Sequence, residues 1–172
     1  EDLPHPPAVR LGLRMISGLQ AESMARIVAA RHERVFDSAE DLARRALIEQ
    51  HEMKVLAAAD ALMSLSGHRR QQVWDAAALR SMPELLRDAP FDEDILDLPQ
   101  APEGEEILFD YASMGLTLRR HPMALLRPHL DERRMLTAEQ LDAMPNGQIV
   151  RYCGIVTLRQ QPETANGTVF IS

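Results

Sequence analysis

The feature that most constrains this chain is a short pattern that occurs twice, 49 residues apart. Leu13-x-x-Ile16-Ser17-Gly18-Leu19-Gln20 aligns with Leu62-x-x-Leu65-Ser66-Gly67-His68-Arg69, an offset of 62 − 13 = 49. Each copy is followed by a stretch without glycine or proline whose apolar residues recur at helical spacing, as at Met24, Ile27 and Val28 after the first copy. The repeat therefore predicts a helix, a glycine turn and a second helix, used twice.

Such a turn is chemically suited to hold a phosphate. The first N–H groups of the helix after the turn have no partner within the helix, they lie at the positive end of its dipole, and glycine lets the backbone approach a ligand closely. The candidate phosphate-binding residues are Gly18, Leu19 and Gln20 in the first turn, Gly67, His68 and Arg69 in the second, and the neighbouring Arg14, Arg26 and Arg70. The alternative is that the two glycines only terminate helices, where glycine is the usual residue.

The rest of the first 82 residues is also predicted to be helical. Apolar spacing predicts helices at residues 21–32, 49–64 and 69–80, and Ser38 followed by Asp41 predicts a capped helix between the first two. We expect these residues to form one helical unit.

The net charge of −7 is unevenly distributed. Residues 1–80 carry 11 basic and 11 acidic side chains, whereas residues 81–147 carry 6 and 14. The excess acid lies mostly between Glu84 and Glu106, among four prolines, which is typical of an extended linker over residues 83–103. The acidic residues Asp92, Glu93 and Asp94 could instead bind a metal, but the spacing and glycine of an EF-hand loop are missing.

After the linker, the pattern predicts two more helices and then a change to strands. Residues 104–118 can form a helix that is broken by Gly115 and stopped by His121-Pro122. Thr137 with Gln140 predicts a capped helix over residues 137–144. Alternating apolar residues over 150–159 predict a strand, and residues 168–171 a second strand after a turn. Since two strands do not form a stable sheet, we expect them to be the start of a truncated β domain.

Composition excludes several other classes. No apolar run is long enough to span a bilayer, the first residues do not have the pattern of a signal peptide, and a single cysteine, Cys153, cannot form an internal disulfide. We therefore expect a cytoplasmic protein without membrane contact.

Several motifs resemble one known family, the bacterial DNA polymerase III alpha-type (C-family) polymerases, and in particular the C-terminal region of their error-prone branch. They are Val9-Arg10-Leu11-Gly12-Leu13 with its following glycine turn, Ala57 to Leu65 with Gly67-His68-Arg69, Asp110-Tyr111-Ala112-Ser113-Met114-Gly115-Leu116-Thr117-Leu118-Arg119-Arg120-His121-Pro122, and Gly154 to Gly167. The basic pair Arg119-Arg120 before His-Pro is similar to the error-prone form, whereas Gln20 and Asp60 stand where relatives have glycine.

The resemblance implies a mainly α chain in four parts. It implies a tandem helix-hairpin-helix DNA-binding domain over residues 1–82, the acidic linker over 83–103, a helical connector over 104–147 and the first strands of an OB-like β-barrel over 148–172. The implied parent is a bacterial, cytoplasmic DNA-directed DNA polymerase that uses Mg²⁺ for translesion synthesis. The resemblance places its catalytic carboxylates outside this chain, so we expect no catalytic residue and no bound metal here.

Two functions stay open from the sequence. The first is binding of duplex DNA through its phosphates at the hairpins. The second is a protein-interaction module that recruits lesion-bypass partners through its helical faces or the acidic linker.

Overall fold

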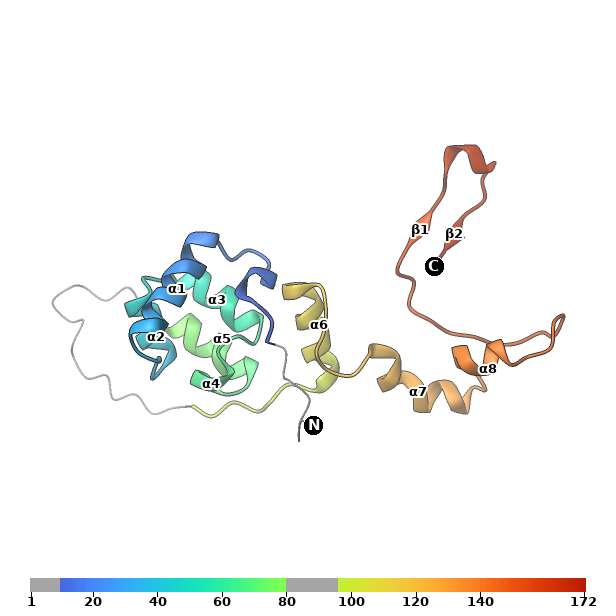
Figure 1. Ribbon diagram of the computed structural model, residues 1–172. Coiled ribbons are helices and arrows are strands. Elements are labelled where there is room, and N and C mark those ends of the chain that lie inside the picture. Colours follow the sequence, from blue (N-terminus) through green and yellow to red (C-terminus); the bar gives the residue numbers. More distant parts are fainter. Residues whose placement is uncertain (1–9, 80–95) are drawn as a thin grey trace, which may run out of the picture. The chain divides into compact units, whose positions relative to one another are not determined.

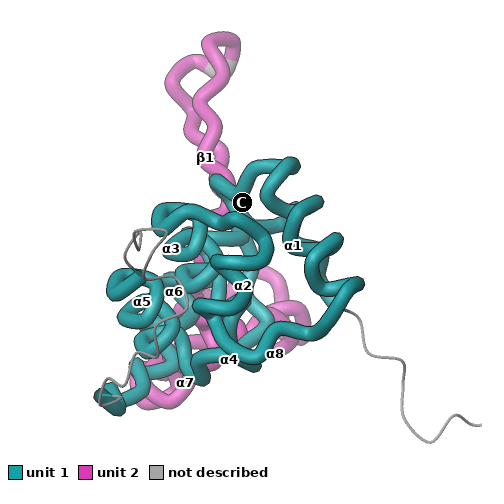
Figure 2. The backbone as a smooth tube through the Cα atoms, turned by 90° about the vertical axis from the view of Figure 1, so that its left-hand side faces the viewer, with its two compact units in different colours: residues 1–119 teal, residues 120–172 magenta. Residues whose placement is uncertain are grey.

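The computed structural model describes residues 10–79 and 96–172, and within these the chain is mainly helical (Figure 1). It divides into two compact units, residues 1–119 and 120–172 (Figure 2). The unit boundary falls inside the expected connector of residues 104–147. The mainly α fold class predicted from the sequence is confirmed.

The described residues of unit 1 form a 3-10 turn and six helices. They are η1 (Leu13–Met15), α1 (Ala21–Glu33), α2 (Ala39–Arg45), α3 (Gln50–Ala58), α4 (Met63–Ser66), α5 (Arg69–Ala78) and α6 (Glu103–Met114). α3 lies beside α5 and α6 packs against α3 (Figure 1). The core that joins these helices centres on Met53, Leu56, Leu62 and Ala76, each at most 1% exposed.

The helix starts follow from local chemistry. The Ser38 hydroxyl accepts the Asp41 N–H at 3.0 Å, as its position in the sequence predicts. α3 begins with a capping box in which Glu49 and Glu52 each accept the other's backbone N–H. Glu52 is also 4% exposed and accepts a hydrogen bond from the Ser23 hydroxyl, so the start of α3 is bound directly to α1.

The single helix predicted over residues 49–64 is two helices. Asp60 has a φ of +58°, in the left-handed region, and ends α3 before α4 begins. Aspartate tolerates this region better than most residues. Here its carboxylate also accepts hydrogen bonds from Gln72 Nε2 at 2.7 Å and Arg119 Nη2 at 2.8 Å. Contacts with residues distant in sequence therefore stabilise the break between α3 and α4, which helical spacing alone does not predict.

Unit 2 contains two helices and a hairpin. α7 (Pro122–Glu132) was not predicted, because His121-Pro122 was interpreted only as the stop of the preceding helix. Pro122 occupies the first turn of α7, where the N–H that proline lacks would have no partner within the helix. α8 (Ala138–Asp142) has the predicted capping box of Thr137 and Gln140.

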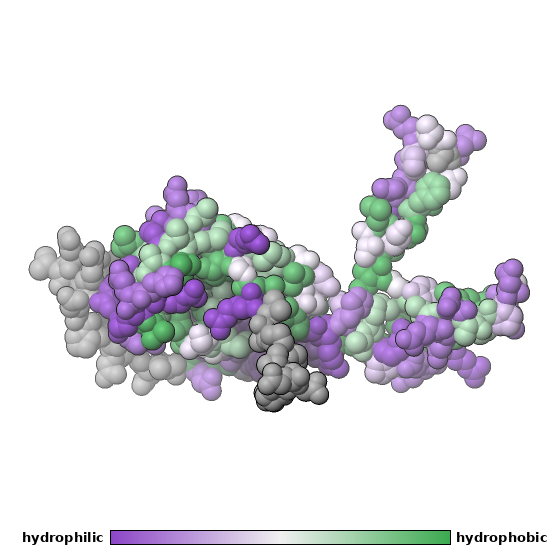
Figure 3. Space-filling model, in the orientation of Figure 1, coloured by the Kyte–Doolittle hydropathy of each residue, from purple (hydrophilic) through white to green (hydrophobic). Residues whose placement is uncertain are grey.

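The predicted strands are shorter than expected. β1 (Arg159–Gln160) pairs antiparallel with β2 (Phe170–Ile171), Arg159 opposite Ile171, and η3 (Glu163–Ala165) lies in the loop between them. Residues 150–158 form no regular strand, because no neighbouring sheet covers their apolar side chains. Figure 3 shows hydrophobic surface along this hairpin, where Val156, Leu158 and Phe170 are about half exposed. A two-stranded hairpin is consistent with the start of an OB-like barrel.

Candidate nucleic-acid interface

Both repeated glycines lie in turns between helical segments, as the sequence predicts. Gly18 follows η1 and precedes α1, with a φ of +85°. Gly67 separates α4 from α5, with a φ of +74°. A Cβ added at Gly67 would have no atom within 4 Å, so glycine is required there by the backbone conformation and not by lack of space.

The first hairpin leaves several backbone donors open. In the described part of the chain, the N–H groups of Gly18, Gln20 and Ala21 have no acceptor, and α1 has no side-chain cap. Gly18 and Gln20 are exposed. The neighbouring amides are occupied: Ser17 donates to the Ser113 carbonyl at 2.8 Å, and Leu19 to the Ile16 carbonyl at 3.4 Å. The turn therefore offers a small set of N–H groups at the N-terminus of a 13-residue helix.

Leu19 fixes this turn to the core instead of reaching outward. It is 7% exposed and belongs to the same apolar cluster as Ile16 and Ile27. The turn is thus held from within by Leu19 and from one side by the bond from Ser17 to α6.

The two arginines expected beside the first hairpin differ from one another. Arg14 is exposed and has no bonded partner among residues 10–79 and 96–172. Arg26 donates to the carbonyls of Ala46 at 2.9 Å and Leu47 at 3.1 Å, and so caps the C-terminus of α2. Of these two, only Arg14 is free to meet a phosphate.

The second hairpin is already engaged by its own chain. Nδ1 of His68 accepts the Gln71 N–H at 3.3 Å and caps α5, while Nε2 donates to the Leu98 carbonyl at 2.7 Å. The Gln71 side chain accepts the Leu98 N–H at 3.3 Å. Residues 96–101, which we call the strap, thus cross the start of α5.

Arg70 is held by the same segment. Its Nη1 donates to the Pro99 carbonyl at 3.0 Å and its Nη2 lies 3.3 Å from the Glu105 carboxylate. The described end of the expected linker is therefore packed on unit 1, with Ala101 buried. The remainder of that linker, including Asp92, Glu93 and Asp94, lies outside the described residues.

Arg69 is the clearest departure from the sequence prediction. Its side chain is 2% exposed, Nη1 donates to the Glu106 carbonyl at 2.8 Å and lies 3.1 Å from the Glu106 carboxylate, and Nη2 donates to Asp110. A guanidinium enclosed in this way does not reach a phosphate outside the molecule, so the expected contact of Arg69 with DNA does not fit the structure. Arg69 instead fixes α6 to α5.

Arg119 completes the same ion cluster, which we call the Arg69–Arg119 cluster: Asp60, Arg69, Glu106, Asp110 and Arg119. Nη1 of Arg119 lies 2.7 Å from Asp110, and Nη2 lies 2.8 Å from Asp60 and 3.0 Å from Glu106. The sequence indicates the Arg69–Arg119 cluster only weakly, because its five residues come from four places in the chain. Arg119 lies in the long motif that resembles the polymerase family, but its partners could not be read from spacing.

Two members of the cluster, Asp110 and Arg119, have pKa values shifted toward their ionised forms. Burial, the largest single influence, raises the pKa of Asp110, but hydrogen bonds from Thr117, Arg69 and Arg119 outweigh it and hold that pKa below its ordinary value. Burial lowers the pKa of Arg119, and hydrogen bonds to Asp110 and Asp60 raise it further than burial lowers it. An Asp110 carboxylate held in this state is a poor proton donor at neutral pH, so Asp110 does not serve as a general acid.

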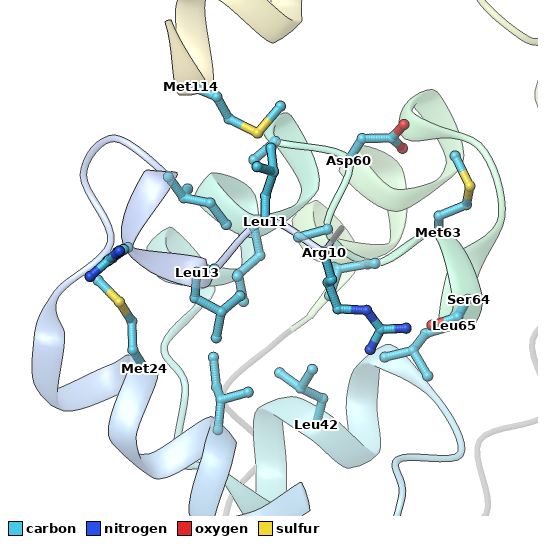
Figure 4. A pocket seen from close by; sticks show the side chains of 18 of the residues that line it. Arg10, Leu11, Leu13, Met24, Leu42, Asp60, Met63, Ser64, Leu65 and Met114 are labelled. Atoms are coloured by element: carbon cyan, nitrogen blue, oxygen red, sulfur yellow. The ribbon is translucent and has the colours of Figure 1, made fainter. Parts of the chain in front are cut away.

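A groove of about 1130 Å³ lies beside the first hairpin (Figure 4). Leu11, Leu13 and Met114 are among the apolar side chains that line it, and Asp60 and Arg119 border it. Asp60 and Arg119 pair with each other, and the exposed Arg10, Arg14 and Arg31 also line the groove, so it combines apolar side chains with cations.

The residues that the structure describes contain no group of three His, Cys, Asp or Glu placed to hold a metal ion. The same residues include no helix that is both long enough and apolar enough to cross a bilayer.

Comparison with known proteins places both hairpins in one recognised motif. A family model described as helix-hairpin-helix motif matches residues 3–72, which include both glycine turns. Relatives named error-prone DNA polymerase match 96% of the chain: 50% identity over 169 residues in Ralstonia pickettii, 48% over 167 in Bordetella parapertussis and 43% over 166 in Methylococcus capsulatus. The chain spans 16% of the length of each of these relatives.

Proposed function

Because the chain is homologous over 96% of its length to one segment of the bacterial error-prone DNA polymerases, we propose that it is a non-catalytic, DNA-binding segment of such an enzyme. On this proposal the parent extends a primer across damaged template, and this segment holds the duplex. In the described residues, the neighbouring carboxylates Asp60, Glu106 and Asp110 are paired with Arg69 and Arg119, so they do not fit the Mg²⁺ site of the parent.

The observation that carries the proposal is the set of open donors at the first hairpin. Among the residues that the structure describes, the N–H groups of Gly18, Gln20 and Ala21 have no acceptor, and they lie at the N-terminus of α1, where the helix dipole favours an anion. Arg14, exposed and without a bonded partner among the same residues, adds a cation in the segment that leads into the turn. A phosphodiester oxygen has the charge and the acceptor geometry that these donors need. Since the proposed donors are backbone N–H groups that contact phosphate, which carries no sequence information, we expect binding with little sequence preference.

The test is the affinity of the whole chain for a short fluorescent duplex, measured by anisotropy over a range of salt concentrations. Gly18→Ala should weaken binding by at least about tenfold, because a residue with a Cβ is strained at a φ of +85° and shifts the amides from their positions. Gly147→Ala is the matched control, since Gly147 has a φ of +87° in an exposed turn of unit 2.

Arg14→Ala should reduce the slope of log affinity against log salt by about one, since one phosphate contact is lost. Arg133→Ala is its control, because Arg133 is exposed at the end of α7. Equal effects of Gly18→Ala and Gly147→Ala, or binding that does not weaken with salt, would refute the proposal.

A second candidate function is favoured by the outer face of α6. Leu108, Phe109 and Tyr111 are 70%, 50% and 42% exposed on this helix. Contiguous exposed apolar side chains are typical of surfaces that pack against another protein. This face would serve recruitment of a lesion-bypass partner, and Phe109→Ser would then abolish the interaction while leaving duplex affinity unchanged.

A further inference from the structure

The strap and the start of α5 form a contact that uses the donors of the second hairpin. The carbonyl oxygens of Leu98 and Pro99 accept from His68 Nε2 and Arg70 Nη1, at 2.7 and 3.0 Å. The Glu105 carboxylate, 3.3 Å from Arg70 Nη2, supplies the negative charge. One carboxylate and two carbonyl oxygens thus surround the groups that a phosphate would need at this hairpin.

The hairpin beneath the strap keeps open backbone donors. In the described part of the chain, the N–H groups of His68 and Arg69 have no acceptor, although Gly67 donates to the Met63 carbonyl at 3.1 Å. The two hairpins are therefore alike in their turns and differ in access: the first is open, and the second is crossed by its own chain.

Displacing the strap from the start of α5 should cost only a moderate free energy. Arg70 and Glu105 have side chains 40% and 52% exposed, and an ion pair of this exposure contributes little once salt screens it. By contrast, Arg69 beneath it is 2% exposed and fixed to Asp110. Displacing the strap would free Arg70 and His68 without disturbing the Arg69–Arg119 cluster.

We propose that the strap is an autoinhibitory segment: residues 96–101, with Glu105, compete with a DNA phosphate for His68 and Arg70, so the second hairpin engages DNA only when the strap leaves. This inference rests on the proposed function, because it assumes that the unit binds duplex DNA. It adds that the chain as folded binds with one hairpin and gains a second contact on release of the strap.

Two uncharged changes should loosen the strap. Gln71→Ala removes the acceptor of the Leu98 N–H, and Pro99→Gly makes the strap backbone more flexible. Neither changes a residue that the proposal places against phosphate. The double variant should bind the duplex about two- to fivefold more tightly, with a salt slope steeper by about one as Arg70 gains a phosphate.

Arg70→Ala separates this mechanism from a general change in the fold. In the unaltered chain it should change affinity by less than about twofold, because Arg70 is held by the strap. In the double variant it should remove the whole gain. Pro145→Gly, at an exposed proline of unit 2, is the matched control for Pro99→Gly. Circular dichroism of every variant checks that the helices are retained.

The outcomes distinguish this inference from the proposed function. If Gly18→Ala abolishes binding but the strap variants bind no more tightly, or their gain survives Arg70→Ala, the strap proposal is wrong and the first hairpin still binds DNA. If the chain and the strap variants all fail to bind duplex DNA, both the strap proposal and the proposed DNA-binding function are wrong.

Discussion

Replacing Arg119 should destabilise unit 1 more than replacing any exposed arginine would. Arg119 contacts Asp110 at 2.7 Å, Asp60 at 2.8 Å and Glu106 at 3.0 Å, and its side chain is 25% exposed. Arg119→Ala leaves three carboxylates around Arg69, so the cluster changes from two cations and three anions to one and three. All three carboxylates are 10% exposed or less and are poorly solvated by water.

The expected cost is about 3 kcal/mol of unfolding free energy. Removing one partner from a buried ion pair typically costs about 3–5 kcal/mol, and the partial exposure of Arg119 places it at the lower end of that range. This is a large part of the stability of a small domain, about 5–15 kcal/mol in total. The cost should shrink as the pH falls through the folded-state pKa of Asp110, which lies below its ordinary value, because protonation of Asp110 removes one of the charges that Arg119 pairs with.

Urea unfolding followed by circular dichroism measures this difference, with Arg133→Ala as the control. Adding Asp60→Ala to Arg119→Ala should restore at least about 1 kcal/mol relative to the sum of the single changes, because one unpaired carboxylate is removed. A cost under about 1 kcal/mol for Arg119→Ala, or strict additivity of the two changes, would show that Arg119 does not compensate the buried carboxylates.

Two further predictions concern the same unit. The pKa values of Asp41, Glu52 and Asp110 lie below their ordinary values in the folded chain. The stability that these carboxylates contribute is therefore present above about pH 4 and is lost as the pH falls through their folded-state pKa values. A urea midpoint that rises on acidification would contradict this expectation. Ser38→Ala should cost about 1 kcal/mol by leaving the Asp41 N–H without its cap, whereas Ser64→Ala, at an exposed serine of α4, should change the midpoint little.

The features predicted well from the sequence are those decided within a few residues. Ser38 before Asp41, and Thr137 before Gln140, specify capped helix starts because donor and acceptor are three residues apart. The glycine turns at Gly18 and Gly67 follow from the same kind of local signal.

The features predicted poorly depend on partners far away in the sequence. Arg69 has the sequence position of a phosphate ligand, but Asp110, 41 residues later, encloses it. The break at Asp60 is stabilised by Arg119, 59 residues later. Alternation over residues 150–158 indicates a strand only if a neighbouring sheet covers one face, and the described hairpin provides two residues on each side.

An amide-resolved NMR titration of the chain with a short duplex tests directly whether backbone amides of the first hairpin hold a DNA phosphate. We expect the resonances of Gly18, Gln20 and Ala21 to shift most and to saturate together, added salt to reverse the shifts, and the amides around Gly147 not to move. Unmoved resonances at these three residues, with the largest shifts elsewhere on the chain, would show that the first hairpin does not hold the phosphate.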